Sequence, residues 1–144
     1  MLVNTGIRHK FRFDKVFKKK PMKNDIQNRT DIEILINSFY NKVKVDPIIS
    51  YFFTDVVQVN WDKHLPKMYD FWENVIFNTG VYEGNPMAQH QHLHHKSPLS
   101  KVHFDEWIKL FTLTVDQLFE GEKAELTKQR ATSIATVMQL KIIY

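Results

Sequence analysis

The sequence predicts a single all-α domain, and three observations support this fold class. Apolar residues recur at spacings of three and four in each long segment, as they do on one face of a helix. Turn-forming residues interrupt these stripes at Asp46-Pro47, at Gly80 and at Pro98. No segment of useful length shows the alternation of apolar and polar residues that is typical of a strand. At 144 residues, the chain has the size of one domain and needs no disulfide to fold.

The first expected helix begins at Thr30. The Thr30 side chain can cap the helix while Glu33 reaches back to the Thr30 amide, which is a reciprocal capping box. One apolar stripe follows, formed by Ile32, Leu35, Ile36, Phe39, Tyr40 and Val43. The helix should end at Asp46-Pro47, because the residue before a proline avoids helical geometry. A short apolar elbow then covers residues 48–53.

Three further helices are expected along the rest of the chain. One runs from Asn60 to Asn78 and should be stopped by Gly80, because glycine commonly follows a helix end. The other two span about Lys101 to Phe119 and about Lys123 to Ile142. Residues 80–100, which lie between the second and third of these four helices, contain two glycines and two prolines. This region is therefore expected to be a loop.

The basic residues are concentrated near the N-terminus. Residues 1–30 carry nine Lys and Arg against two acids, whereas residues 31–144 carry eleven against fourteen. We therefore expect residues 1–29 to be a disordered basic extension and residues 30–144 to form the folded domain. Contact of the extension with nucleic acid or an anionic membrane surface is the alternative. No apolar run of about 18 residues predicts a transmembrane helix, and no secretory signal is visible.

Four of the seven histidines lie within six residues, and the chain has no cysteine. They are His90, His92, His94 and His95. Neutral imidazole is the commonest protein ligand for transition metals, so this segment predicts a metal site. Either these histidines bind a free nickel, zinc or copper ion, or one of them binds the metal of a cofactor. No carboxylate lies between Glu83 and Asp105 to complete a catalytic set.

Several classes of chemistry are excluded or weakly supported by the sequence. The absence of cysteine excludes disulfides, iron–sulfur clusters, thiolate metal sites and cysteine nucleophiles, and it fits a reducing cytoplasm. The chain also lacks a glycine-rich phosphate loop, a Gly-x-Ser-x-Gly turn and a His-Glu-x-x-His zinc motif.

Three segments taken together resemble one protein family. They are Ser38–Val43, then Trp61–Leu65 running to Phe71-Trp72, then Tyr82–His90 running to His103–Trp107. In order and spacing they resemble the truncated haemoglobins, and in particular their third group, which is mainly bacterial. The chain also contains no Gly-Gly pair, whereas other truncated haemoglobins usually carry such pairs at two interhelical corners. The resemblance covers about Asp31 to Met138.

The resemblance implies a two-on-two helical sandwich around haem b, which is iron protoporphyrin IX. The family pattern Gly-Asn-Pro-Met-x-x-His ends in the iron ligand, and the matching residue here is His90. His94 is the alternative ligand, because it lies four residues further on and shares a helix face with His90. By location, Lys63, Lys67 and Lys101 are candidates for contact with the haem propionates.

On the other side of the haem, the resemblance implies a pocket for a small ligand. Tyr40 matches the tyrosine above the iron, His64 the distal histidine, and Trp107 a tryptophan on the same side. The resemblance also implies that Phe53 packs on the haem plane, with Phe52 as its near rival. All three distal side chains can donate a hydrogen bond to the ligand.

The expected function is the binding of O2 and other small diatomic ligands, such as NO, at an open haem site. Three donors around one ligand would retain O2 strongly, which favours chemistry over storage. Dioxygenation of NO and a peroxidase-like reaction are the candidates, and either needs an external reductase. The alternative function is a helical module without haem that binds a free transition metal through His90–His95.

Overall fold

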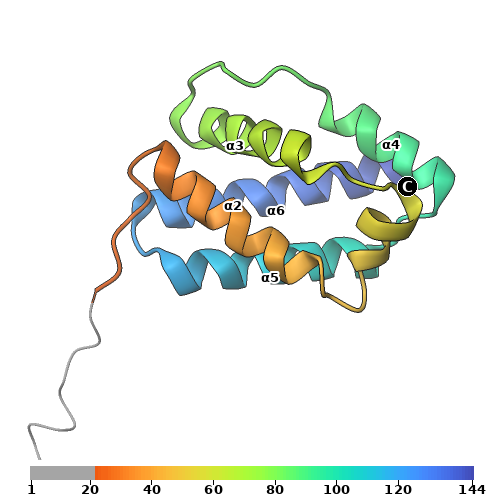
Figure 1. Cartoon of the computed structure of the whole chain (residues 1–144), viewed down its shortest axis with the longest axis horizontal. Helices are drawn as coiled ribbons and strands as arrows, with labels where there is room; N and C mark the ends of the chain where they lie inside the picture. The colour runs from red at the N-terminus through yellow and green to blue at the C-terminus, as the bar shows by residue number, and fades with distance from the viewer. Residues whose placement is uncertain (1–21) are drawn as a thin grey trace, which may run out of the picture.

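The computed structural model describes residues 22–144, and every regular element in this range is a helix (Figure 1). The elements are α2 (Arg29–Val43), the π-helix η1 (Phe52–Val56), α3 (Trp61–Phe77), α4 (Pro86–Lys96), α5 (Lys101–Leu118) and α6 (Glu122–Ile142). The predicted all-α fold is therefore confirmed. None of these described helices is long and apolar enough to cross a membrane.

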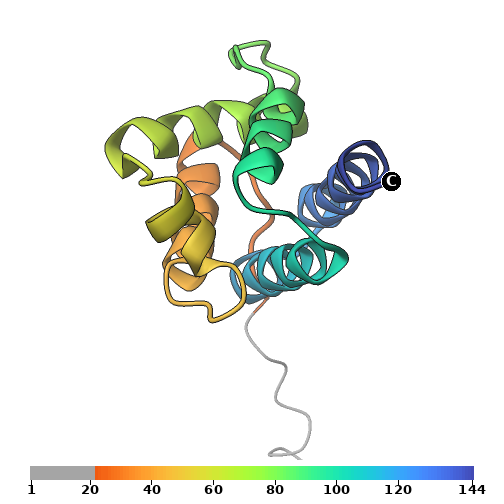
Figure 2. The same cartoon turned by 90° about the vertical axis from the view of Figure 1, so that its right-hand side faces the viewer.

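The four long helices form two packed pairs. Helix α2 packs against α3 and α5 against α6, and the pairs meet where α2 lies on α5 and α3 on α6 (Figures 1 and 2). Helices α5 and α6 are antiparallel because residues 119–121 alone connect them. This arrangement is the expected two-on-two sandwich. Helix α4 lies beside one end of α6, and η1 lies between α2 and α3 in the chain.

The core is built on the apolar stripe of α2. Its residues Ile32, Leu35, Ile36, Phe39 and Val43 are at most 1% exposed. Each such side chain contributes on the order of 1.5–3 kcal/mol through burial. Against this stripe lies a stack of three rings, in which Phe111 is nearly parallel to Trp72 and to Trp107, with centroid distances of 4.6 and 5.4 Å. The stack therefore joins α3 to α5 across the middle of the sandwich.

Helix α2 begins at Arg29, so its cap lies two residues before the expected cap Thr30. Its cap is Asn28, whose side-chain oxygen accepts a hydrogen bond from the Asp31 amide at 3.1 Å. The predicted Thr30 capping box is therefore wrong, and the Glu33 carboxylate instead accepts from the Arg29 guanidinium at 3.2 Å. Asparagine caps a helix as well as threonine does, so Asn28 and Thr30 were both possible caps. The structure uses Asn28.

Residues before position 30 are also part of the packed domain, as Asp25 and Ile26 show. Ile26 is only 2% exposed, and the Asp25 carboxylate accepts hydrogen bonds from the amides of Lys123 and Ala124 at 2.8 Å. These amides lie in the first turn of α6, where helical N–H groups have no partner within the helix. Gly121 allows the approach, since a Cβ there would lie 2.5 Å from Asp25 Cγ. The expectations for residues 1–21 lie outside the described residues.

The expected loop over residues 80–100 is wrong, because it contains helix α4. The Asn85 side chain caps this helix by accepting from the Ala88 amide at 3.0 Å. Pro86 is the first helical residue, a position where the missing N–H of proline costs nothing. The next helix breaker is Pro98, so the glycines and prolines flank the helix rather than interrupt it.

Helix α3 has the predicted extent, but the residue that ends it differs. It runs between the caps Asn60 and Asn78, as expected. Asn78 takes the left-handed conformation, with φ of 55°, and its amide donates to the Asn74 carbonyl at 2.8 Å. Asparagine tolerates this conformation better than other residues with a side chain. The helix therefore ends at Asn78, and the predicted stop at Gly80 is two residues late.

Candidate functional site

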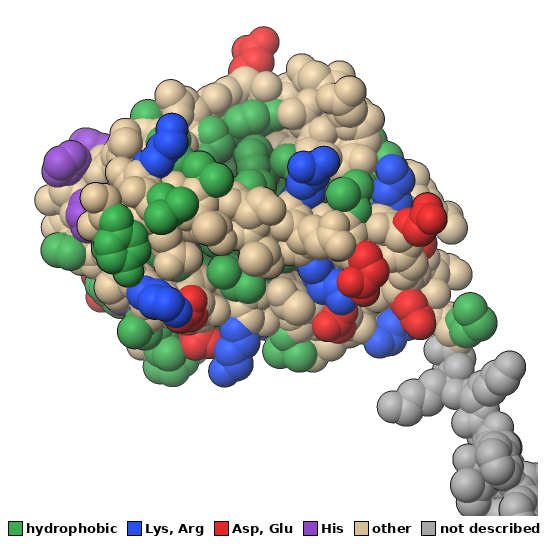
Figure 3. All heavy atoms as spheres, turned by 180° about the vertical axis from the view of Figure 1, so that it is seen from behind, with side chains coloured by type: hydrophobic (Ala, Val, Ile, Leu, Met, Phe, Trp, Pro, Cys, Tyr) green, Lys and Arg blue, Asp and Glu red, His purple; other side chains and the backbone are tan. Residues whose placement is uncertain are grey.

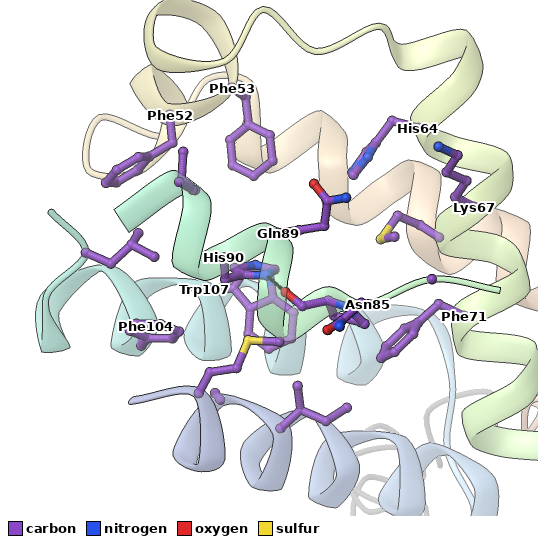
Figure 4. A pocket seen from close by; sticks show the side chains of 18 of the residues that line it. Phe52, Phe53, His64, Lys67, Phe71, Asn85, Gln89, His90, Phe104 and Trp107 are labelled. Atoms are coloured by element: carbon purple, nitrogen blue, oxygen red, sulfur yellow. Dashed lines mark hydrogen bonds between the residues drawn. The ribbon is translucent and has the colours of Figure 1, made fainter. Parts of the chain in front are cut away.

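A cavity of about 330 Å³ lies between the helices, and side chains from all six elements line it. Aromatic rings make up much of its wall. Figure 4 labels Phe52, Phe53, Phe71, Phe104 and Trp107 among them, and Tyr40, Trp72 and Tyr82 also line the cavity. Figure 3 shows a hollow on the rear face of the molecule in which hydrophobic side chains are exposed. An apolar space of this kind suits a cofactor or ligand that is itself largely apolar.

The sequence-predicted site residues all line this cavity. Tyr40 comes from α2, Phe53 from η1, His64 from α3, His90 from α4 and Trp107 from α5. Figure 4 shows His64 and His90 facing the cavity from their separate helices. Helical segments that are distant in the sequence therefore bring these five side chains to one place.

His90 has the geometry of a metal ligand. Its Nδ1 atom lies 2.7 Å from the Pro86 carbonyl oxygen, one turn earlier on α4. Because a carbonyl oxygen only accepts hydrogen bonds, Nδ1 carries the proton and Nε2 keeps a free lone pair. Burial lowers the pKa of His90 below 6.5, although the bond to Pro86 opposes this shift. His90 is therefore neutral at neutral pH, with its ring orientation fixed as metal-binding histidines require.

The other histidines of α4 do not line the cavity. The Nδ1 atom of His94 accepts a hydrogen bond from the Leu99 amide at 2.9 Å, so this side chain satisfies the backbone beyond the helix end. His92 and His95 are exposed. All three belong to α4 rather than to the expected loop, and helical geometry spreads them around the axis.

The alternative of a free-metal site in this segment is not supported. Within residues 22–144, no group of three or more histidine, aspartate or glutamate side chains lies close enough to hold a metal ion. The segment His90–His95 therefore offers a single imidazole to the cavity, and that imidazole belongs to His90.

Tyr40 and His64 form a hydrogen-bonded pair at the cavity wall. The Tyr40 hydroxyl lies 3.3 Å from Nε2 of His64, and the two rings meet edge to face. Burial raises the pKa of Tyr40 far above its ordinary value of 10. Burial also lowers the pKa of His64, and the positive charge of Lys67 lowers it further. At neutral pH the hydroxyl is therefore protonated and the imidazole is neutral.

The two rival phenylalanines both line the cavity, but they have different neighbours. Phe53 packs edge to face on Tyr40 with a centroid distance of 6.0 Å, so it lies beside the hydrogen-bonded pair. Phe52 instead packs on the His103 ring at 4.8 Å. Trp107 contributes a wall whose ring is held parallel to Phe111, with 12° between their planes.

Many lining residues were not predicted from the sequence, and the polar ones among them include Gln89 and His103. Gln89 directly precedes His90 in the sequence, but the predicted role of His90 as metal ligand did not imply that Gln89 also lines the cavity. His103 accepts the Ser100 amide proton on Nδ1 at 3.0 Å, so its Nε2 carries a proton and lies 3.4 Å from the Tyr51 hydroxyl. Of the three lysines considered for propionate contact, Lys67 alone lines the cavity.

This combination of fold and site defines a haem protein of the globin class. A two-on-two sandwich holds one neutral imidazole at an aromatic cavity, with a tyrosine–histidine pair on another wall. These residues fit haem, since a neutral imidazole can ligate its iron and apolar side chains can pack on a porphyrin. The chain belongs to the bacterial-like globin family, whose family model matches residues 24–142. This membership assigns the chain the binding of small ligands through haem.

Two comparisons specify the branch of the family. The chain is 29% identical over 121 residues to the group 3 truncated hemoglobin ctb of Campylobacter jejuni, which covers 82% of this chain and 93% of that protein. The crystal structure of a group III truncated hemoglobin from the same organism superposes with a TM-score of 0.73 at 28% identity, covering 84% of this chain and 95% of that one. The resemblance to group III truncated haemoglobins is therefore confirmed.

Proposed function

We propose that this protein holds haem b through His90 and uses it for chemistry on O2, NO or peroxide rather than for O2 storage. The observation that carries the proposal is the state of His90. Its Nδ1 proton is donated to the Pro86 carbonyl, so its Nε2 atom is free at a cavity that also contains the Tyr40–His64 pair.

Different cavity residues would contact different parts of the cofactor. His90 Nε2 would be the axial ligand, and the rings of Phe53, Phe71 and Phe104 would pack on the porphyrin. Haem b is the expected type, because covalent attachment of haem through thioethers needs cysteines and the chain has none. Lys67 would pair with a propionate, since its charge is at the cavity edge. When bound, the haem supplies a redox-active iron with one open position for a small ligand.

The tyrosine–histidine pair would act on the ligand. The protonated Tyr40 hydroxyl can donate to the partly negative end of a polar diatomic molecule. Neutral His64 can accept from Tyr40 or donate in its place, depending on its tautomer. The Trp107 indole N–H is a donor only and would add a third hydrogen bond. A hydrogen bond to a charged partner contributes about 1.5–3 kcal/mol, so such a site retains its ligand long enough to react.

Both candidate reactions need electrons from outside the chain. Dioxygenation combines NO, O2 and one electron to give one nitrate ion. Peroxide reduction consumes two electrons and two protons and gives two water molecules. A separate reductase is therefore the expected partner. We place this chemistry in the cytoplasm, a reducing compartment that suits a sequence without cysteine.

The first test is the absorption spectrum of the full chain, purified from haem-supplemented cells, in the ferric and ferrous states. A Soret band with one haem per chain is expected. A colourless protein that takes up no haem on titration would disprove the proposal. The second test supplies a chemical reductant together with either O2 and NO or hydrogen peroxide, and it measures the nitrate formed and the peroxide consumed. Nitrate formation supports dioxygenation, whereas peroxide consumption without nitrate formation supports the peroxidase-like reaction.

A further inference from the structure

Trp61 covers the Tyr40–His64 pair without lining the cavity itself. Its ring centroid lies 5.2 Å from that of Tyr40 and 5.8 Å from that of His64, and it packs edge to face on both. It also stacks on Phe53 at 5.8 Å, with 18° between the ring planes. Trp61 is half-buried and does not belong to the cavity wall. One ring therefore contacts all three of these wall residues from the side away from the cavity.

A cation holds this ring in place from α2. The Lys44 ammonium lies 4.4 Å from the centre of the Trp61 ring, well within the range of a cation–π interaction. Lys44 follows Tyr40 by four residues, so both side chains project from the same face at the end of α2. Lys44 is itself exposed. The contact therefore links the outer surface of the protein to the residue that covers the pair.

Trp61 also occupies a position that can open. It is the first residue of α3, where backbone amides lack partners within the helix, and the Asn60 side chain caps this turn only through a long contact of 3.4 Å to the Lys63 amide. Helix ends are the parts of a helix that open at the lowest free energy. A movement of Trp61 would uncover Tyr40, Phe53 and His64 together.

We propose that Trp61 is a positioning residue that closes the ligand side of the cavity and selects entering ligands by size, with Lys44 as its latch. The inference rests on the proposed function, because the ligand side is defined by haem bound at His90. A ligand that enters here must displace a ring held by three aromatic contacts and one cation. A larger ligand needs a wider displacement, so its entry is slowed more.

The test measures how fast two ligands of different size bind to the ferrous, haem-loaded full chain after flash photolysis. The probes are carbon monoxide and n-butyl isocyanide. We expect Trp61→Ala to raise the association rate of carbon monoxide about tenfold and that of the isocyanide more, because a barrier of packed rings is removed. Lys44→Met should raise both association rates by about two- to fivefold, which is the fold-change that corresponds to the free energy of one exposed cation–π contact. Trp61→Phe should give intermediate rates.

A matched pair elsewhere in the protein provides the control. The Lys123 ammonium lies 5.6 Å from the centre of the Phe77 ring, and neither residue lines the cavity. Phe77→Ala and Lys123→Met should leave both association rates unchanged. The infrared stretching frequency of bound carbon monoxide gives a further reading, because it reports the hydrogen bond from Tyr40. Lys44→Met should leave this frequency unchanged, since a latch alters entry and not the hydrogen bond.

The outcomes separate this inference from the proposed function. A wild-type chain without a Soret band would overturn both. A haem-loaded chain whose rates are the same in the wild type, Trp61→Phe and Lys44→Met proteins would overturn the role of Trp61 alone. Equal acceleration of carbon monoxide and isocyanide binding in Trp61→Ala would overturn selection by size. If Trp61→Ala does not retain haem, the Trp61→Phe and Lys44→Met variants decide the question.

Discussion

The two regions that carry His90 and His64 to the cavity are built in opposite ways. Helix α4, which carries His90, contains four histidines and two glutamines, has no buried residue and packs chiefly against α6. The region that carries His64 is a cluster of rings from α2, η1 and α3. In that cluster Tyr40, Phe53, Trp61 and His64 contact one another with centroid distances of 5.2–6.0 Å.

This difference indicates which region depends on the cofactor. The ring cluster is stabilised by its own packing, which proceeds whether or not the cavity is filled. Helix α4 has no such internal support, so its stability should come largely from what binds His90. Ligand binding stabilises most the segments that contact the ligand and are otherwise weakly held. Four experiments test this difference between the two regions.

The largest effect is expected from His90→Ala. Because His90 offers the only imidazole nitrogen of α4 that faces the cavity, its loss should abolish stoichiometric haem retention. His94→Ala is the matched control on the same helix and should retain haem, since His94 bonds to the Leu99 amide instead. The haem-to-protein ratio after gel filtration measures both. Loss of haem in His94→Ala with retention in His90→Ala would reverse the assignment.

Tyr40→Phe should speed O2 dissociation by roughly ten- to a hundredfold. The estimate converts the 1.5–3 kcal/mol of a charge-assisted hydrogen bond into a rate. Stopped-flow displacement of O2 by carbon monoxide measures it. Tyr51→Phe is the control, because Tyr51 bonds to His103 and does not line the cavity. An unchanged rate in Tyr40→Phe would remove this hydroxyl from contact with the ligand.

Removal of haem should loosen α4 more than the ring cluster. We expect amide hydrogen exchange in residues 86–96 to speed up by about tenfold or more, while exchange in α2 changes little. Mass spectrometry of peptides from the haem-loaded and haem-free proteins would show the contrast. Equal changes in the two regions would mean that α4 is no more dependent on the cofactor than α2 is.

The smallest effect is expected from Arg29→Met. The Arg29 guanidinium bonds to Asp70 at 2.6 Å and to Glu73 at 2.5 Å, which ties the start of α2 to α3. Arg29 is 36% exposed, so the loss should be only about 1 kcal/mol in the free energy of unfolding, and less at high salt. Lys101→Met removes a pair within one helix and should cost less still. Urea titrations at two salt concentrations would compare them.

The order of α2, α3, α5 and α6 was predictable because each of these helices carries an apolar stripe and local end signals. Helix α3 has asparagines at both ends and an unbroken stripe between them, so its limits followed from the sequence. The start of α2 did not, because Asn28 and Thr30 give similar local signals. The choice depends on tertiary packing of the preceding residues, where Ile26 is buried and Asp25 accepts hydrogen bonds from the start of α6. Helix α4 was missed because the number of prolines and glycines was considered rather than their positions.

The site was predictable only where the family resemblance named its residues. Periodicity alone places Tyr40 on an apolar stripe but cannot say that His64 lies 3.3 Å away. The contact of Lys44 with Trp61 had no sequence signal, because it joins the end of one helix to the start of the next across η1. A cavity lined by six elements is a property of tertiary packing.

The contact between Asp25 and α6 has a practical consequence for making shorter versions of this protein. Burial raises the pKa of Asp25, but the hydrogen bonds from Lys123, Ala124 and Ile26 outweigh it and lower the pKa, so the carboxylate is charged. A recombinant fragment that starts at residue 30 would leave the first amides of α6 without this acceptor and would expose the surface that Ile26 covers. Fragments designed to remove the basic segment should therefore keep Asp25 and Ile26.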